Sequence, residues 1–351
     1  MTGRRGMAVA IALLLAALAA AGCGLGPGAD VGSVELTVTR EYGAVPVLQR
    51  SLEAKESDTV MRALEGSADI ETRYGGGFVH SINGVAEGER GGDPYDWFFY
   101  VDGVESPVGA ADVSLQGGER IWWDYRDWSA TNHVPAVVGS WPAPFTDGIA
   151  GKPHPVVVEC AGEAGNTGVS QGANASRGSF RSPSDRKAPR AGWRDACHGV
   201  QEALEREGVK LASGGSPKGA IRVLVGPWKL LRKDPAAGLV QEGPAESGVY
   251  ADFEAGVRPF RHMPQEKTNA AWGWELGALD EGGGEARRLG PNAGLVAATS
   301  RYGGPPVWLV TGGTSAAVRA AAGALDAAHL RDHYAVAIEG GKTIPLPVEG
   351  R

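Results

Sequence analysis

The sequence predicts an α+β protein of two units, a small α+β unit followed by a larger α/β layer sandwich. Three observations lead to this prediction. The chain has 351 residues, and ordinary domains have about 100–200. Strand patterns surround a single helix pattern before residue 141, and strands alternate with helices after residue 156. A hydrophobic content of 42% with 10 Trp argues against wholesale disorder, and the 54 glycines show no collagen period.

The N-terminus has the pattern of an export signal. Arg4 and Arg5 precede an apolar run over 7–20, and small residues then lead to Cys23. Small residues directly before a cysteine resemble a bacterial lipobox, although Ala20 stands where leucine is usual. We therefore expect a signal peptide over 1–22 and an extracytoplasmic protein held to the cell membrane by lipid on Cys23. The alternative is an ordinary signal peptide with an incidental cysteine.

The first folded unit is expected over 34–141, after a Gly- and Pro-containing tether over 23–33. Apolar and polar residues alternate over 34–40, which is typical of a half-buried strand, and a second strand is expected over 45–48. Ser57 or Asp58 is expected to cap a helix. Further strands are predicted over 78–82, 97–101 and 120–125. Asn-Gly, Asp-Gly and Gly-Gly pairs separate these strands, and the helix should cover one face of their sheet.

A Pro-rich linker over 142–155 leads to the second unit, 156–348. The strands expected in it are 156–158, 221–225, 295–299, 307–310, 335–338 and 344–346. Helices are predicted over 193–211 and 315–328, and Gly282–Gly284 should form a hairpin tip. Residues 161–192 are rich in Gly, Ala, Ser and Arg with almost nothing to bury, so we expect a disordered insertion within this unit.

The cysteine count agrees with export. With Cys23 lipidated, Cys160 and Cys197 remain as an even pair in an oxidising compartment, where disulfides persist. A disulfide between them would close the insertion. The alternatives are two unrelated buried thiols, or a site formed by Cys197 and His198.

Three segments of the first unit carry a family resemblance: 74–84 (YGGGFVHSING), 96–103 (DWFFYVDG) and 117–125 (GGERIWWDY). In order and spacing they resemble the transcobalamin-like C-terminal domain, a small β-domain of cobalamin carriers that recurs alone in bacterial surface proteins. The resemblance implies a β-grasp-like fold and a small-molecule or carbohydrate ligand. It covers about 90 residues, and nothing in the chain resembles the helical barrel that completes the cobalamin site in the carriers. The second unit resembles the C-terminal half of uncharacterised actinobacterial lipoproteins.

The aromatic residues of this region must point to both faces of the sheet, because neighbours in a strand face opposite sides. One face is needed for the core beneath the helix. The other is expected to pack between the domains, to contact a partner protein, or to bind sugars or planar rings by stacking. The candidate ligand-binding residues are Tyr74, Phe78, His80, Asn83, Trp97, Phe99, Trp122, Tyr125 and Trp128.

Enzyme and metal signals are weak, so we predict no catalysis, no cofactor and no metal. His329 and His333 have i,i+4 spacing, but no HExxH motif accompanies them, and neither GxSxG nor a P-loop occurs. The net charge of −7 argues against nucleic-acid binding. The function expected is capture of a small ligand, a cobalamin-type corrinoid or a glycan, for an uptake transporter. The alternative is a cell-envelope structural or protein-interaction module.

Overall fold

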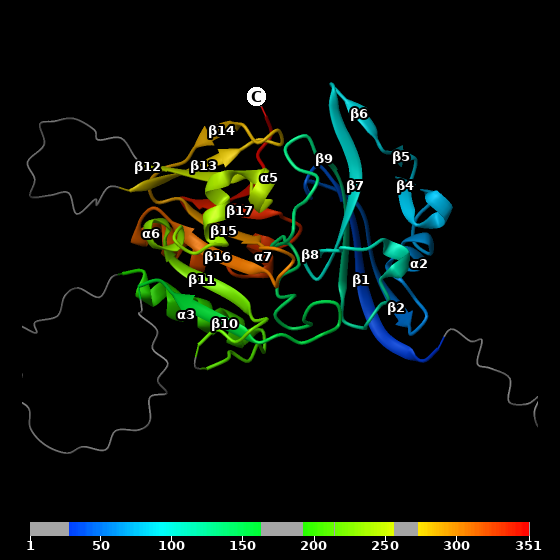
Figure 1. The fold of residues 1–351 in the computed structure, drawn as a ribbon, viewed down its shortest axis with the longest axis horizontal. Coiled ribbons are helices and arrows are strands. Elements are labelled where there is room, and N and C mark those ends of the chain that lie inside the picture. The colour runs from blue at the N-terminus through cyan, green and yellow to red at the C-terminus, as the bar shows by residue number, and fades with distance from the viewer. Residues whose placement is uncertain (1–27, 163–191, 214, 256–272, 351) are drawn as a thin grey trace, which may run out of the picture.

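The computed structural model describes residues 28–162, 192–213, 215–255 and 273–350. They form a mostly β structure of several sheets with fewer helices, which is consistent with the expected α+β class (Figure 1). The expected signal peptide, Cys23 and most of the expected insertion lie outside the described residues. No helix in the described ranges is both long enough and apolar enough to cross a membrane.

The N-terminal unit is built on a six-stranded sheet in the order β2-β1-β9-β7-β6, with β8 paired to β7. Its strands are β1 (Asp30–Arg40), β2 (Val45–Lys55), β6 (Gly88–Arg90), β7 (Asp93–Val101), β8 (Val104–Glu105) and β9 (Arg120–Asp127). β1 pairs antiparallel with β2 and parallel with β9. The strand β1 begins earlier than expected: Asp30 lies opposite Lys55, so the end of the predicted tether belongs to the sheet.

One face of this sheet is covered by a helix and a second small sheet. The helix α2 (Val60–Glu65) is capped by Thr59, whose hydroxyl accepts a hydrogen bond from Arg62 N, rather than by the expected Ser57 or Asp58. The small sheet contains β3 (Ile70–Arg73), β4 (Phe78–Ile82) and β5 (Val85–Ala86). Two 3-10 helices complete the unit, η1 (Tyr74–Gly76) and η2 (Ala110–Asp112). Val60, Met61 and Leu64 of α2 are buried, as their common helical face predicts.

The C-terminal unit contains a second six-stranded sheet, in the order β10-β11-β16-β15-β17-β18. Its strands are β10 (Val156–Cys160), β11 (Ile221–Pro227), β15 (Gly294–Thr299), β16 (Val307–Gly312), β17 (Ala335–Glu339) and β18 (Lys342–Leu346). Each strand predicted in this unit is therefore present. The helices packed on one face are α3 (Arg194–Arg206) and α6 (Ser315–Ala322). The predicted last helix is split, because α6 ends at Gly323 and Asp326 caps a separate α7 (Ala327–Leu330).

A third layer was not predicted from the sequence. It contains the sheet β12 (Ala251–Ala255), β13 (Trp274–Leu279) and β14 (Glu285–Arg288), with short helices α4 (Trp228–Leu231), η3 (Ala237–Glu242) and α5 (Pro244–Ser247). The turn between β13 and β14 contains Gly282–Gly284, as expected for a hairpin tip. Phe253 stacks on Trp228, with ring centroids 4.5 Å apart, so this layer packs on the opposite side of the second sheet from α3 and α6.

The first residues of the expected Pro-rich linker pack against the C-terminal unit. Trp141 and Phe145 are buried, and their rings lie 5.8 and 4.8 Å from that of Trp308 in β16. Residues on both sides of the predicted boundary at 141–142 therefore contribute to the core of the C-terminal unit.

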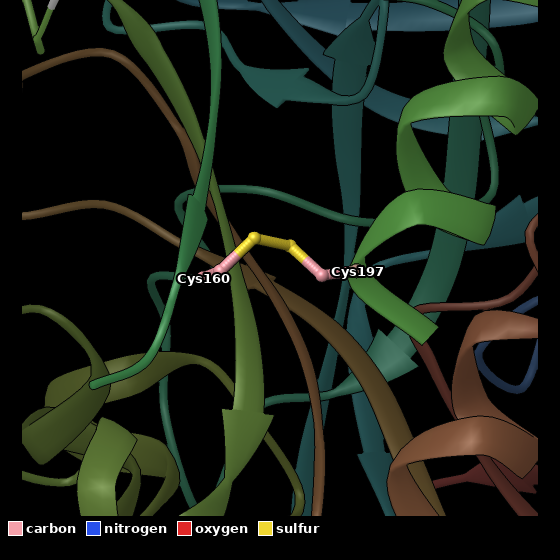
Figure 2. The surroundings of a disulfide bond; sticks show 2 residues. All are labelled: Cys160 and Cys197. Atoms are coloured by element: carbon pink, nitrogen blue, oxygen red, sulfur yellow. A yellow bond between two sulfur atoms is a disulfide. The ribbon is translucent and has the colours of Figure 1, made fainter. Parts of the chain in front are cut away.

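A disulfide joins Cys160, at the end of β10, to Cys197 in α3 (Figure 2). The two Cα atoms are 6.0 Å apart, a usual separation for a bridged pair. The expected pairing is present in the structure, and the bridge closes the segment that contains 163–191.

Candidate functional site

The aromatic strands β7 and β9 do present rings to both faces of the first sheet. Trp97, Phe99, Trp123 and Tyr125 lie on the α2 side, where Phe99 stacks on Trp123 at 4.8 Å between centroids. Trp97 Nε1 donates to Val85 O, and the Tyr125 hydroxyl donates to Ala86 O. Trp97 and Tyr125 are buried and Phe99 is half-buried. Three expected ligand-binding residues thus belong to the hydrophobic core.

The opposite face packs against the C-terminal unit. Trp122 and Tyr100 are fully buried, and both rings contact Tyr334, which precedes β17, at 5.3 and 5.6 Å between centroids. Figure 1 shows the first sheet standing between the C-terminal unit and α2. Trp122 is therefore an interdomain residue. Its expected role in an exposed ligand surface is wrong, because tertiary packing covers this face.

A buried carboxylate is held at this interface by groups from both units. Asp124 accepts hydrogen bonds from Thr39 Oγ1 at 2.5 Å, Gly43 N at 3.1 Å and the Tyr334 hydroxyl at 3.1 Å. Burial raises the pKa of Asp124 to about 6, although these hydrogen bonds favour the ionised form. The carboxylate therefore helps to define how the two units dock.

Cations complete the interface. Arg126 is fully buried, and its guanidinium lies 3.8 Å from the centroid of the Phe98 ring while donating to Thr131 O at 2.9 Å. At the margin, Arg120 pairs with Asp332 at 2.6 Å and Arg331 with Glu35 at 2.8 Å. Those two ion pairs again join one unit to the other.

Three other expected site residues do come together, on the outer side of β4. Phe78 and His80 are half-buried and alternate with the buried Val79 and Ser81. Tyr74 is 86% exposed, and its ring meets that of Phe78 edge-on at 6.1 Å between centroids. The sequence pattern of β4, polar or aromatic residues alternating with core residues, produces this arrangement.

A charged group lies beside these rings. His80 Nε2 is 3.0 Å from Arg73 Nη2, and His80 Nδ1 is 3.3 Å from Glu87 Oε1. Arg73 also pairs with Glu87. We call Tyr74, Phe78, Arg73, His80 and Glu87 the outer patch. It offers an exposed ring together with hydrogen-bond donors and acceptors.

A nearby carboxyl group, that of Asp96, interacts electrostatically with the outer patch. Burial raises the pKa of Asp96 to about 6, the charge of Glu87 raises it further, and His80 acts in the opposite direction. Arg73 and Glu87 were missed from the sequence. The available signal was that Arg73 adjoins Tyr74, and that Glu87 follows the short strand that turns back beside β4.

The remaining two expected residues have other positions. Asn83 occupies a left-handed turn position with φ 50°, and its Oδ1 accepts a hydrogen bond from Asp69 N, so it shapes the β4–β5 turn. Trp128 follows β9, is 38% exposed, and donates its backbone N–H to Pro94 O. Neither residue belongs to the outer patch.

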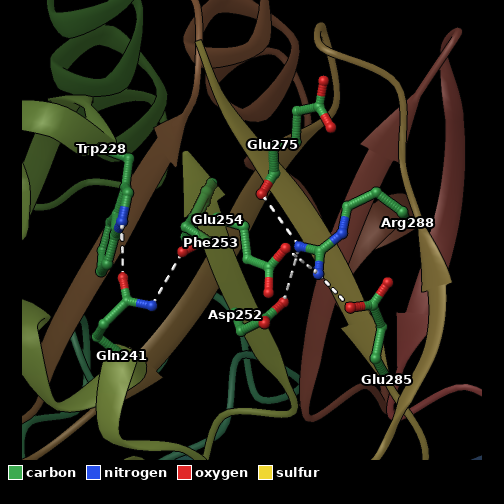
Figure 3. Close-up of polar contacts among 8 residues, drawn as sticks. All are labelled: Trp228, Gln241, Asp252, Phe253, Glu254, Glu275, Glu285 and Arg288. Atoms are coloured by element: carbon green, nitrogen blue, oxygen red, sulfur yellow. Dashed lines mark hydrogen bonds and ion pairs between the residues drawn. The ribbon is translucent and has the colours of Figure 1, made fainter. Parts of the chain in front are cut away.

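One carboxylate cluster has spacing that would suit a metal. Asp252, Glu254 and Glu285 have oxygens within 4.8 Å of one another. Figure 3 shows the guanidinium of Arg288 among them, and it lies 3.2 Å from Asp252 Oδ1 and 3.2 Å from Glu254 Oε2. Arg288 already pairs with all three carboxylates, so we interpret the cluster as an ion-pair network on β12–β14.

Comparison with known families gives one match. A family described as "Domain of unknown function (DUF4430)" matches residues 57–127, the part of the chain from α2 to β9. The match therefore includes the outer patch and the aromatic strands. No curated protein matches the chain.

Proposed function

We propose that this protein is a non-catalytic binding protein of the cell envelope, anchored by lipid on Cys23, that captures a small ligand on the outer patch. In this proposal the N-terminal unit is a transcobalamin-like, β-grasp-like domain. The central parallel pair β1–β9 and the helix on one sheet face support that relationship. An uptake transporter would receive the ligand.

The observation that carries the proposal is the exposure of Tyr74. A tyrosine ring that is 86% exposed, in a left-handed backbone position with φ 52°, contributes little to the core. Phe78 supports it from one side, and the charged side chains of Arg73, His80 and Glu87 lie close by. One aromatic ring with adjacent donors and acceptors suits a sugar ring, which stacks on one face and hydrogen-bonds at its edge. The patch therefore favours a glycan over the larger corrin ring.

The test is calorimetric titration of residues 24–351 with soluble cell-wall glycan fragments and, separately, with cyanocobalamin. We expect heat of binding with the glycan and its loss in Tyr74→Ala, with unfolding unchanged. Tyr302→Ala is the matched control, because Tyr302 is 90% exposed and has φ 53°. Binding of neither ligand, or equal loss in both variants, would contradict the proposal. Binding of cyanocobalamin alone would replace the glycan by a corrinoid.

A second candidate is a structural or protein-interaction module of the envelope. The burial of Tyr100 and Trp122 against the C-terminal unit favours it, because the largest aromatic surface then serves packing. Under this alternative the outer patch contacts a protein. Tyr74→Ala then leaves the calorimetric titrations with glycan and with cyanocobalamin unchanged.

A further inference from the structure

The strand β2 forms an open edge of the first sheet. It is 11 residues long and stands at the end of the strand order, and no second strand pairs with its outer side in the described part of the chain. Gln49, Arg50, Ser51 and Glu53 are exposed along it. In an antiparallel pair, alternate residues of an edge strand direct their N–H and C=O groups away from the partner. An extended peptide can satisfy these groups.

A groove opens beside the second half of the same strand. Its volume is about 160 Å³, and Leu52 and Ala54 of β2 line it together with Val34 of β1. Ala63 of α2 and Leu115 also line it, and Asp58, Arg62 and Ser67 add polar groups to its lining. A dry apolar cavity of about 150 Å³ accommodates benzene, so this groove has room for one leucine or phenylalanine side chain.

The edge and the groove have matching geometry. Leu48 and Leu52 pack toward the α2-side core, and Ala54 is part of it, so the groove opens on this face of β2, where the alternate position between the two leucines is the exposed Arg50. A strand added beside β2 would direct every second side chain to this face. Glu53, exposed between Leu52 and Ala54 and also lining the groove, favours a basic residue beside it in such a strand.

We propose that β2 and its groove form a docking site for an extended peptide, in which alternate aliphatic side chains face α2 and one enters the groove. The peptide adds a strand to the sheet through main-chain hydrogen bonds, and the groove selects the side chain. This site is separate from the outer patch, so it does not depend on the proposed function.

The experiment uses the mature chain, 24–351, and a fluorescein-labelled peptide of alternating leucine and threonine with lysine at each end. Fluorescence anisotropy should detect binding. Ala63→Leu and Ser67→Leu, which fill the groove from two positions, should each weaken it about tenfold or more. Ala322→Leu, the same change in a different cavity between α3 and α6, should leave the affinity within about twofold.

Backbone pairing is tested on the peptide, so the protein stays intact. Leucine and threonine amides point to opposite edges of an extended chain. Methylation of one set should abolish binding, and methylation of the other set should preserve it.

Three results would overturn the proposal. The first is no binding at about 1 mM peptide. The second is equal binding of both methylated peptides, or of wild type and the two groove variants. The third is a concentration-dependent dimer, in analytical ultracentrifugation, that Ala63→Leu abolishes, because a second copy would then occupy the edge.

Discussion

The hydroxyl of Tyr334 donates a hydrogen bond to the buried carboxylate of Asp124 across the boundary between the two units, at 3.1 Å. The two residues are 210 positions apart in the sequence. Around this bond, the rings of Trp122 and Tyr100 pack on Tyr334, and Arg120 pairs with Asp332. The segment before β17 is thus one part of the C-terminal unit that holds the first sheet, and Tyr250, which contacts Tyr42, is another.

Tyr334→Phe should lower the free energy of unfolding by about 1–3 kcal/mol, because it removes one donor from a buried carboxylate. Urea unfolding monitored by circular dichroism measures the change. Tyr302→Phe is the control: its hydroxyl accepts from Arg301 at an exposed site, so the effect should stay within about 0.5 kcal/mol. Equal effects of the two variants would show that the Asp124 bond does not stabilise the interface.

Stability should fall as the pH rises from about 4 to about 7. Burial raises the pKa of Asp124 to about 6 and those of Asp102 and Glu281 to about 7, from model-peptide values near 4. In that window the folded protein binds more protons than the unfolded chain, so deprotonation destabilises the fold, and the loss levels off above the folded pKa. Urea unfolding at several pH values tests this, and Asp102→Asn should reduce the slope. A slope of the opposite sign would refute the prediction.

The disulfide should contribute roughly 3–4 kcal/mol, because it restricts the unfolded chain over a separation of 37 residues. The double variant Cys160→Ser with Cys197→Ser should therefore melt at a lower temperature than the wild type. Adding a thiol reductant should lower the melting temperature of the wild type and leave the double variant unchanged. A wild type insensitive to complete reduction would contradict this expectation.

The N-terminal unit should not be soluble and monodisperse when it is expressed alone. A fragment of residues 24–150 exposes Trp122 and Tyr100, which are fully buried against the C-terminal unit in the whole chain. We expect it to aggregate and to bind a hydrophobic dye. A soluble, monodisperse fragment without dye binding would show that these rings find another arrangement.

Part of the outer patch was predictable because its signals are local. The strand predicted over 78–82 is present as β4, in which Phe78 and His80 share one side, and Asn83-Gly84 correctly predicted a turn. The sequence did not separate the rings of β7 and β9 from the outer patch. Strand alternation assigns Trp122 and Trp123 to opposite faces, but it does not say which element covers each face.

The third layer was not predicted from the sequence for a related reason. Strands β12–β14 are short and carry charged residues such as Asp252 and Arg288, so they lack a strong apolar alternation. They form where Phe253 stacks on Trp228, a contact between elements that are not adjacent in sequence. Pairing and stacking across the fold, rather than local pattern, decide that layer.

The sequence alone predicted a fold of strands and helices, most strands of the two large sheets and a Cys160–Cys197 disulfide among the alternatives, because periodicity, turn residues and cysteine parity are properties of short segments or of counts. Only the tertiary structure decided what covers the second aromatic face of the first sheet. Trp122 could equally have packed against a ligand or a protein surface, since burial of an aromatic ring is favourable in both cases. Tyr334, from the far end of the chain, packs on Trp122 and covers this face, while Tyr74 stays exposed.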